Sequence, residues 1–330
     1  MTRLPIALLP GVALAALVIA GCGDTPADTT GTTADAHSTT THQLAVVASF
    51  YPLQEAAEQI GGDRVQVTNL TPPGGEPHDL DLTPASISAL EHSKLALYLG
   101  QGFQPAVSKA IGALPSSVTA VDLLDGQQLR RAAKGIPGVR GEVEGGEGES
   151  LAGGKDPHVW VDPARFIAIA TKIEQALIAA DPDGRATYER NADRYLKTLR
   201  ALDAAFEAGL AHCETKVVVT SHAAFGYLTD RYSLTQAAIA GISPDDEPDP
   251  KSLAATAKYA KVHGVSTVFF ESLVPKALAQ TVASEIGART DALNPVEGLT
   301  KDELAAGASY ASIQRDNLKR LTRGLRCTAS

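Results

Sequence analysis

Short apolar runs alternate along this chain with amphipathic stretches of helical period. The runs typical of strands lie at 44–50, 65–70, 95–100 and 117–123, and again at 216–221, 265–272 and 288–294. Helical sequences separate them; one ends at Gly61-Gly62, and another begins with Thr83 as N-cap and Pro84 at its first position. Alternating strands and helices predict parallel sheets covered by helices. Because the series occurs twice, we expect an α/β protein with two lobes, each a mostly parallel sheet flanked by helices.

Two longer helices are expected between the lobes. Residues 162–182 form the first, with Asp162 as its cap, and residues 185–210 form the second. In the second, large or apolar residues recur at alternating steps of four and three, which defines one continuous face: Tyr188, Ala192, Tyr195, Leu199, Leu202 and Phe206. At about 1.5 Å per residue this helix is roughly 39 Å long. It could link both lobes, although a surface helix on one lobe fits the same pattern.

The N-terminus has the pattern of an export signal. Arg3 precedes an apolar run over 4–20, which is short for a membrane span and typical of a signal peptide. The run ends in Ile19-Ala20-Gly21-Cys22, which resembles a bacterial lipobox, where the cysteine is acylated. An uncleaved anchor or a plain secretory signal is the alternative. We predict a lipoprotein signal peptide over 1–21, lipidation of Cys22 and a disordered, threonine-rich tether over 22–43. The protein would then be extracytoplasmic and lipid-anchored to the bacterial cell membrane.

The cysteines fit an oxidising compartment. The chain has three, and if Cys22 carries lipid, Cys213 and Cys327 remain as a pair. Their bridge would fasten the C-terminal helix to its lobe, and we expect it to be structural rather than redox-active.

Composition excludes several kinds of partner. A net charge of −9 argues against nucleic acid. Aromatic residues make up 5%, which is too few for a platform that stacks sugars or bases. The 44% of hydrophobic residues supports a globular core.

Three histidines occupy connections around the predicted strands. His78 lies in a Pro/Gly loop after the strand at 65–70, His158 lies in the loop before the 162–182 helix, and His222 directly follows the strand at 216–221. Ligands of parallel sheets collect beyond the carboxyl ends of the strands, so each of these side chains could face a cleft. Neutral imidazole is the commonest metal-binding side chain. Capping of a helix or a hydrogen bond to a backbone carbonyl remains the alternative for each histidine.

Four short motifs carry a resemblance to a known family. They occur in the family's order: "PHDLDLTP", "DPHVWVDP", "SHAAFGYLTDRYSL" and "LNPVEGLT". With "GISPDDEPDP" and "FFESLV", the chain resembles, over about residues 44–327, the zinc branch of the zinc/manganese solute-binding lipoproteins of ABC importers. This resemblance implies an N-terminal lobe (44–184), a rigid linking helix (185–211) and a C-terminal lobe (212–330). It also implies capture of Zn²⁺ between the lobes and delivery to an ABC permease with its ATPase subunit.

The same resemblance implies the metal ligands. They would be His78, His158 and His222, with Glu297 fourth, as in relatives that share the "LNP-x-E" form. Other members have an aspartate where Asn294 stands or use water, and Asp291 and Glu76 are also close in sequence. Three imidazoles and one carboxylate suit tetrahedral Zn²⁺, whereas manganese sites contain more oxygen ligands. Manganese or iron as the cargo stays open.

The Gly/Glu-rich region over 126–156 departs from the family. Many zinc members have a histidine-rich stretch where this chain has 141–155. The glutamates at 142, 144, 147 and 149 could hold cations loosely, although a solvated surface loop is the simpler interpretation.

Two functions from other classes compete with transport. A zinc hydrolase would use three histidines on the metal and Glu297 as base for a bound water. No His-Glu-x-x-His helix and no nucleophile elbow occurs in the sequence, so we expect no enzyme. An adhesin or structural lipoprotein that the metal merely stabilises is the second rival.

Overall fold

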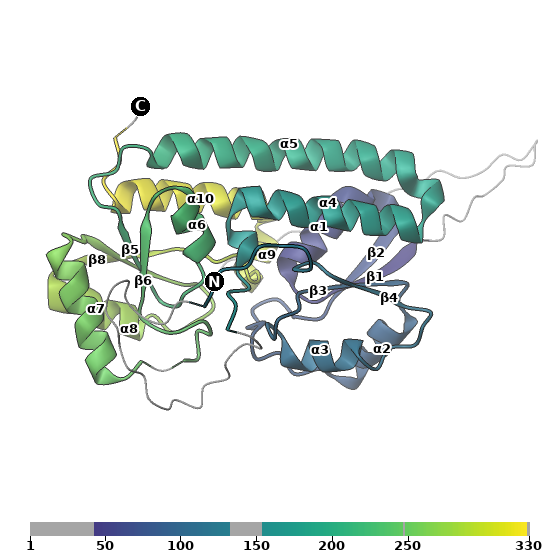
Figure 1. Ribbon diagram of the computed structural model, residues 1–330, viewed down its shortest axis with the longest axis horizontal. Helices are drawn as coiled ribbons and strands as arrows, with labels where there is room; N and C mark the ends of the chain where they lie inside the picture. The colour runs from purple at the N-terminus through teal and green to yellow at the C-terminus, as the bar shows by residue number, and fades with distance from the viewer. Residues whose placement is uncertain (1–42, 133–153, 247, 329–330) are drawn as a thin grey trace, which may run out of the picture. The chain divides into compact units, whose positions relative to one another are not determined.

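The structure is a computed structural model that describes residues 43–132, 154–246 and 248–328 (Figure 1). The predicted signal peptide, Cys22 and all of the predicted tether except residue 43 lie outside the described residues, as do the glutamates of the Gly/Glu-rich region. Among the described residues, no helix combines the length and the apolarity that a membrane crossing requires.

Two parallel sheets organise the chain. The first contains β1 (Leu44–Ala48), β2 (Val65–Asn69), β3 (Leu95–Tyr98) and β4 (Thr119–Asp122), in the order β2-β1-β3-β4. The second contains β5 (Val217–Thr220), β6 (Thr235–Ala238), β7 (Thr267–Phe270) and β8 (Arg289–Ala292), in the equivalent order β6-β5-β7-β8. The predicted α/β class with two parallel sheets is therefore confirmed, and every predicted run contains a strand.

The sequence pattern missed one strand, β6. Its residues, Thr-Gln-Ala-Ala, include one β-branched and no aromatic side chain, so the sequence there shows little strand preference. It lies at the edge of the second sheet and pairs only with β5. Its strand state comes from that pairing rather than from local preference.

Ten α-helices are described, with single 3₁₀ turns at η1 (Gly62–Arg64), η2 (Val159–Val161) and η3 (Pro182–Gly184). Their bounds are α1 Tyr51–Gly61, α2 Pro84–His92, α3 Pro105–Ile111, α4 Pro163–Ala180, α5 Arg185–Leu210, α6 Gly226–Arg231, α7 Pro250–Val262, α8 Ala277–Ile286, α9 Lys301–Ala305 and α10 Tyr310–Gly324.

The predicted caps are present. Thr83 Oγ1 accepts a hydrogen bond from the backbone N–H of Ser86 at 3.1 Å, and Asp162 Oδ1 accepts one from Ala164 at 2.9 Å. Each satisfies a backbone donor that the first turn of a helix leaves free.

A single buried cluster connects the two sheets. It takes Val46 from β1, Val218 from β5 and Leu199 from α5, together with residues of α1, α4 and α10. Because successive side chains of a strand point to opposite faces, Val47 packs into a separate cluster on the other face of the first sheet. Val219 does the same in the second sheet. The faces toward α5 thus share one core, which restricts how far the sheets can separate.

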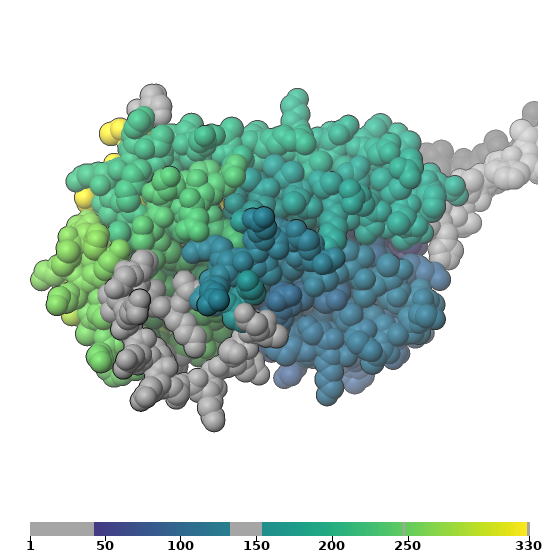
Figure 2. Space-filling model, viewed as in Figure 1, coloured from purple at the N-terminus to yellow at the C-terminus, as the bar shows by residue number. Residues whose placement is uncertain are grey.

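Helix α5 contacts both halves of the chain, the first half containing the sheet of β1–β4 and the second half containing the sheet of β5–β8. It packs against α1 and α4 of the first half and against α10 of the second, and its predicted apolar face is buried. Asp203 of α5 also accepts hydrogen bonds from Arg231 and Tyr232 near the end of α6. In Figure 1 it runs alongside α4 and α10, and in Figure 2 it covers one edge of the surface above both the blue and the green residues.

Cys213 and Cys327 form the disulfide that the sequence predicts. The bond joins the turn between α5 and β5 to the residues after α10, with a sequence separation of 114. It therefore holds the C-terminal helix to the second sheet.

Candidate metal centre

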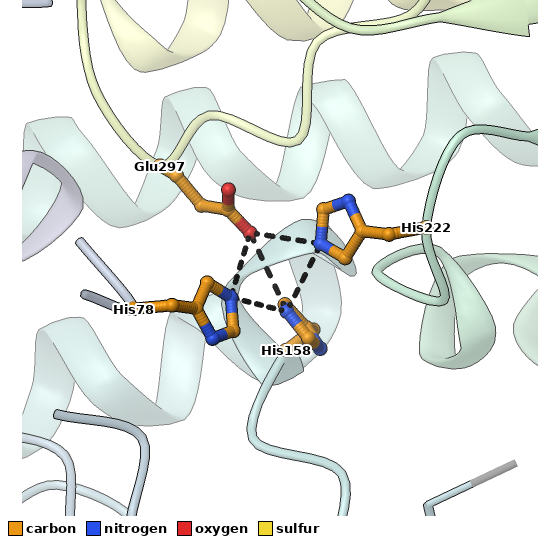
Figure 3. Close-up of side chains that lie close together, drawn as sticks. All are labelled: His78, His158, His222 and Glu297. Carbon is orange, nitrogen blue, oxygen red and sulfur yellow. Dashed lines mark hydrogen bonds and ion pairs between the residues drawn. The ribbon is translucent and has the colours of Figure 1, made fainter. Parts of the chain in front are cut away.

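The four predicted ligand residues meet at the carboxyl ends of the strands. His78 follows β2, His222 follows β5 and Glu297 follows β8, while His158 immediately precedes η2. Figure 3 shows that the side chains point toward one another from four separate stretches of chain. Parallel sheets direct these ends to a common edge, so the topology accounts for the meeting.

The donor atoms form a compact set. The Nε2 atom of His158 lies 3.3 Å from Nε2 of His78 and 3.4 Å from Nε2 of His222. Glu297 Oε1 lies 3.4 Å from Nε2 of both His158 and His222, and 3.7 Å from Nε2 of His78. All four atoms lie within 4.8 Å of one another.

These separations match the edges of a small tetrahedron. Ligand distances of about 2.0–2.1 Å around Zn²⁺ imply donor–donor distances of about 3.3–3.4 Å for tetrahedral geometry. Of the six separations among four donors, four fall in that range, the His78–Glu297 contact is longer at 3.7 Å, and the pair formed by His78 and His222 lies within 4.8 Å. The set therefore has room for one ion at its centre.

Two of the rings are fixed by buried carboxylates. His158 Nδ1 lies 2.9 Å from Asp156 Oδ1, and His222 Nδ1 lies 2.6 Å from Glu271 Oε2. Because Nδ1 donates to these acceptors, each neutral ring presents the Nε2 lone pair to the centre. Lone pairs and a carboxylate oxygen then converge where exposure is 6% or less, and Glu297 Oε1 has no hydrogen-bond partner within the described residues. Such a concentration of acceptors requires a cation, either protons or a metal ion.

The pKa directions reflect the same balance. Burial dominates at His78 and lowers its pKa. At His158 and His222 burial also favours the neutral ring, but the facing carboxylates outweigh it and raise both pKa values. Burial alone would raise the pKa of Glu297, yet the surrounding histidines hold it well below its usual range. The glutamate is therefore ionised and ready to bind a cation.

Glu297 sits on a strained turn. Val296 has a φ of 61°, a left-handed value that is rare for a β-branched residue. Asn294 Oδ1 accepts from the Val296 N–H at 2.7 Å, and Trp160 Nε1 donates to the Pro295 carbonyl at 2.9 Å. These bonds stabilise the conformation that directs Glu297 toward the histidines.

The other residues considered for the fourth position lie elsewhere or have other partners. Asp291 pairs with Arg320 and Arg323. Asn294 supports the turn, and Glu76 accepts a hydrogen bond from the backbone N–H of His78 through Oε1 and is not among the four residues whose donors converge.

Sequence reasoning missed two residues of the centre, Asp156 and Glu271. Each lies inside a motif already singled out, "DPHVWVDP" and "FFESLV". The position of Asp156, two residues before His158, could have indicated that its carboxylate orients the histidine ring. Glu271 is far from His222 in the sequence, and only the pairing of β5 with β7 brings them together.

A family comparison accounts for this architecture. Residues 46–324 match the family described as "ZnuA: Zinc-uptake complex component A periplasmic". The chain belongs to this family.

Individual relatives also resemble this chain in sequence and structure. This family member is 36% identical over 283 residues to "Zinc-binding lipoprotein AdcA" of Streptococcus pneumoniae serotype 4, covering 84% of this chain and 55% of AdcA. It thus spans about half the length of that relative. It is 34% identical over 317 residues to "High-affinity zinc uptake system protein ZnuA" of Bacillus subtilis (strain 168), covering 94% of both chains. The crystal structure of the Zn(II)-bound ZnuA-like domain of S. pneumoniae AdcA matches with a TM-score of 0.71 and 34% identity, over 86% of this chain and 99% of that domain.

Proposed function

We propose that this chain is the extracytoplasmic zinc-binding component of an ABC-type metal importer. It captures one Zn²⁺ through His78, His158, His222 and Glu297 and delivers it to a membrane permease driven by an ATPase subunit. The observation that carries the proposal is the convergence of four buried donor atoms within 4.8 Å of one another. The zinc-uptake family and the names of the relatives support it.

The donor chemistry favours zinc among divalent cations. Three imidazole nitrogens with one carboxylate oxygen suit a borderline ion in a tetrahedral shell. Manganese favours more oxygen ligands and a higher coordination number, which four converging donors do not supply. Zinc should therefore compete successfully against manganese for this site.

Delivery requires that the shell can open. His78 and His158 come from the first half of the chain, and His222 and Glu297 come from the second. A small movement between the halves would remove donors from one side and weaken the shell. We propose that α5 and the shared core limit this motion, with lobes over 44–184 and 212–330 and a linking helix over 185–211.

Membrane attachment belongs to the same proposal. Cleavage after residue 21 and acylation of Cys22 would place the mature protein outside the cytoplasm, held to the cell membrane through the tether over 22–43. A Cys22→Ala variant should then be released from the membrane fraction, and retention of that variant would contradict lipid anchoring.

Metal analysis tests the ligand set. The purified protein should hold one zinc per chain, and the His222→Ala variant should lose it. His263→Ala is the matched control, because His263 is exposed and its described contacts are with Tyr259, outside the donor set. Stoichiometric zinc in the His222→Ala variant would contradict the proposal.

Transport is tested in cells. Deletion of the gene should slow growth in zinc-depleted medium, with recovery on expression of the wild-type chain but not of the His222→Ala variant. Recovery by both chains would contradict delivery through this site.

A hydrolase would instead need an open metal position for water, and cleavage of ester or peptide substrates that depends on His222 would favour it.

A further inference from the structure

The four donors of the proposed zinc site are held in place unequally. His158, His222 and Glu297 each have a second set of contacts that fixes the side chain or its backbone, and His78 has no equivalent for its ring. This difference rests on hydrogen bonds and burial, and it bears on the order in which ligands join and leave the ion.

His222 has the strongest support. Glu271 Oε2 accepts from His222 Nδ1 at 2.6 Å, while its other oxygen, Oε1, accepts from the His222 backbone N–H at 3.0 Å. The two bonds fix the ring relative to its own backbone. Glu271 is 3% exposed, so water competes little with them.

His158 is held by a similar contact, in which one carboxylate oxygen accepts both hydrogen bonds. A single oxygen, Asp156 Oδ1, accepts from both Nδ1 at 2.9 Å and the backbone N–H at 3.0 Å of His158. Asp156 is 2% exposed, and its own carbonyl accepts a hydrogen bond from the hydroxyl of Tyr227 at 2.7 Å. A contact between the halves therefore holds the residue that orients His158.

Glu297 is fixed through its backbone. Asn317 of α10 donates to the Asn294 carbonyl at 2.7 Å and accepts from the Asn294 N–H at 2.9 Å. Asn294 in turn supports the left-handed Val296 that precedes the ligand. Both asparagines are buried, and the bonds that hold the turn do not involve the Glu297 carboxylate.

His78 lies in the connection between β2 and α2. Its backbone N–H donates to Glu76 Oε1 at 3.0 Å, but within the described residues no hydrogen bond fixes its Nδ1 atom. The ring instead packs edge-on against Phe103, with 4.8 Å between ring centroids. An aromatic edge restrains a ring less specifically than a charged hydrogen bond does.

We propose, on the basis of the proposed function, that His158, His222 and Glu297 form a preset three-ligand site and that His78 is the exchangeable fourth ligand. Asp156 and Glu271 are the positioning residues that keep two of the three imidazoles in place. His78 completes the shell last on capture and leaves it first on release. Among the three histidines, His78 also has the longest separation between Nε2 and Glu297 Oε1, at 3.7 Å.

Cobalt(II) provides the test, because its visible spectrum reports coordination geometry. The wild-type protein with Co²⁺ should show the intense absorption of a four-coordinate site. The His78→Ala variant should still bind one Co²⁺, with faster release to a chelator, and added imidazole should restore the wild-type spectrum by occupying the space of the missing ring. The His222→Ala variant should lose stoichiometric Co²⁺, and imidazole should not restore it.

The outcomes separate this inference from the proposed function. If the wild-type chain binds no metal, the proposed function fails. If it binds metal but the His78→Ala and His222→Ala variants lose it equally, or imidazole restores both, the division into preset and exchangeable ligands is wrong. Circular dichroism of each metal-free variant verifies that it folds, so a loss of metal reports on the site.

The positioning residues have a sharper test of their own. Loss of a partner of this kind weakens metal binding about 10–100-fold. Asparagine can replace the single accepting oxygen of Asp156, but glutamine cannot replace both accepting oxygens of Glu271. Glu271→Gln should therefore weaken Co²⁺ binding more than Asp156→Asn and alter the visible spectrum. The exposed Glu91→Gln should change neither, and the reverse order of effects would overturn the assignment.

Discussion

The two halves of the molecule share a strand order but deliver their donors differently. In the second half, His222 and Glu297 follow β5 and β8 within a few residues. In the first half, His78 lies within the long connection between β2 and α2. His158 lies near the end of a still longer connection, between β4 and α4. The common topology thus determines where the site lies, and the connections determine how firmly each donor is held.

The second half also has the more extensive support. The disulfide and the Asn294–Asn317 contact both join the residues around β5 and β8 to α10 or to the segment after it. We therefore expect substitutions in the second half to lower the free energy of unfolding more than matched substitutions in the first half do.

Removal of the disulfide should have the largest effect on stability. Replacement of Cys213 and Cys327 by alanine releases a loop with a separation of 114 residues, which corresponds to about 4–5 kcal/mol in the chain-entropy account. Thermal unfolding with and without reductant measures the loss. Zinc affinity should change little, because the disulfide is no part of the donor set. A stability unchanged within about 1 kcal/mol would show that this bond does not hold the second half.

The Asn317→Ala substitution should have the second-largest effect on stability. It leaves the N–H and carbonyl of Asn294 without their partner, at about 1–3 kcal/mol of unfolding free energy, and it should also weaken zinc binding because the turn that carries Glu297 loosens.

Asn191→Ala is the matched control in contact with the first half. Its side chain donates one hydrogen bond to the Ile60 carbonyl and accepts one from the exposed Arg194, which water can replace, so the loss should be smaller and zinc affinity should stay constant. Equal loss of zinc affinity in both variants would remove the distinction between the halves.

Acidification should weaken zinc binding. The raised pKa values of His158 and His222 mean that the metal-free chain carries protons there above the usual histidine pKa, and zinc must displace them. The lowered pKa values of His78 and Glu297 remove these groups from the competition near neutral pH. From about pH 7.5 to about pH 5 the affinity should fall at least about tenfold. Isothermal titration giving one affinity at both pH values would contradict histidine ligation.

The smallest expected effect is at a helix cap in the first half. Thr83→Ala removes the acceptor for the Ser86 N–H at the start of α2, which should cost about 1 kcal/mol of unfolding free energy. Because α2 follows the loop of His78, zinc release should accelerate slightly. Urea unfolding and chelator-trapped release measure the two effects, and a stability gain would contradict the capping role.

Much of this architecture could be predicted from periodicity. The apolar runs located the strands other than β6, and the spacing from Tyr188 to Phe206 identified the buried face of α5. Edge strand β6 has too little local preference to be seen before its partner is known.

The centre was predictable only in part. Motifs in the sequence identified the four side chains that the structure brings together, but the partner of His222 depends on how β7 lies beside β5. Likewise, the left-handed backbone of Val296 depends on more than its neighbour Asn294, because Asn317 and Trp160 hold the turn from distant elements. Contacts between elements therefore set the fine geometry of the site.

X-ray absorption at the zinc edge of the loaded protein reports the number and type of ligands on the ion. We expect one zinc per chain with four nitrogen or oxygen neighbours at about 2.0–2.1 Å and the outer scattering of three imidazole rings. A sulfur neighbour, a shell of six oxygens or fewer than two imidazoles would contradict the proposed ligand set.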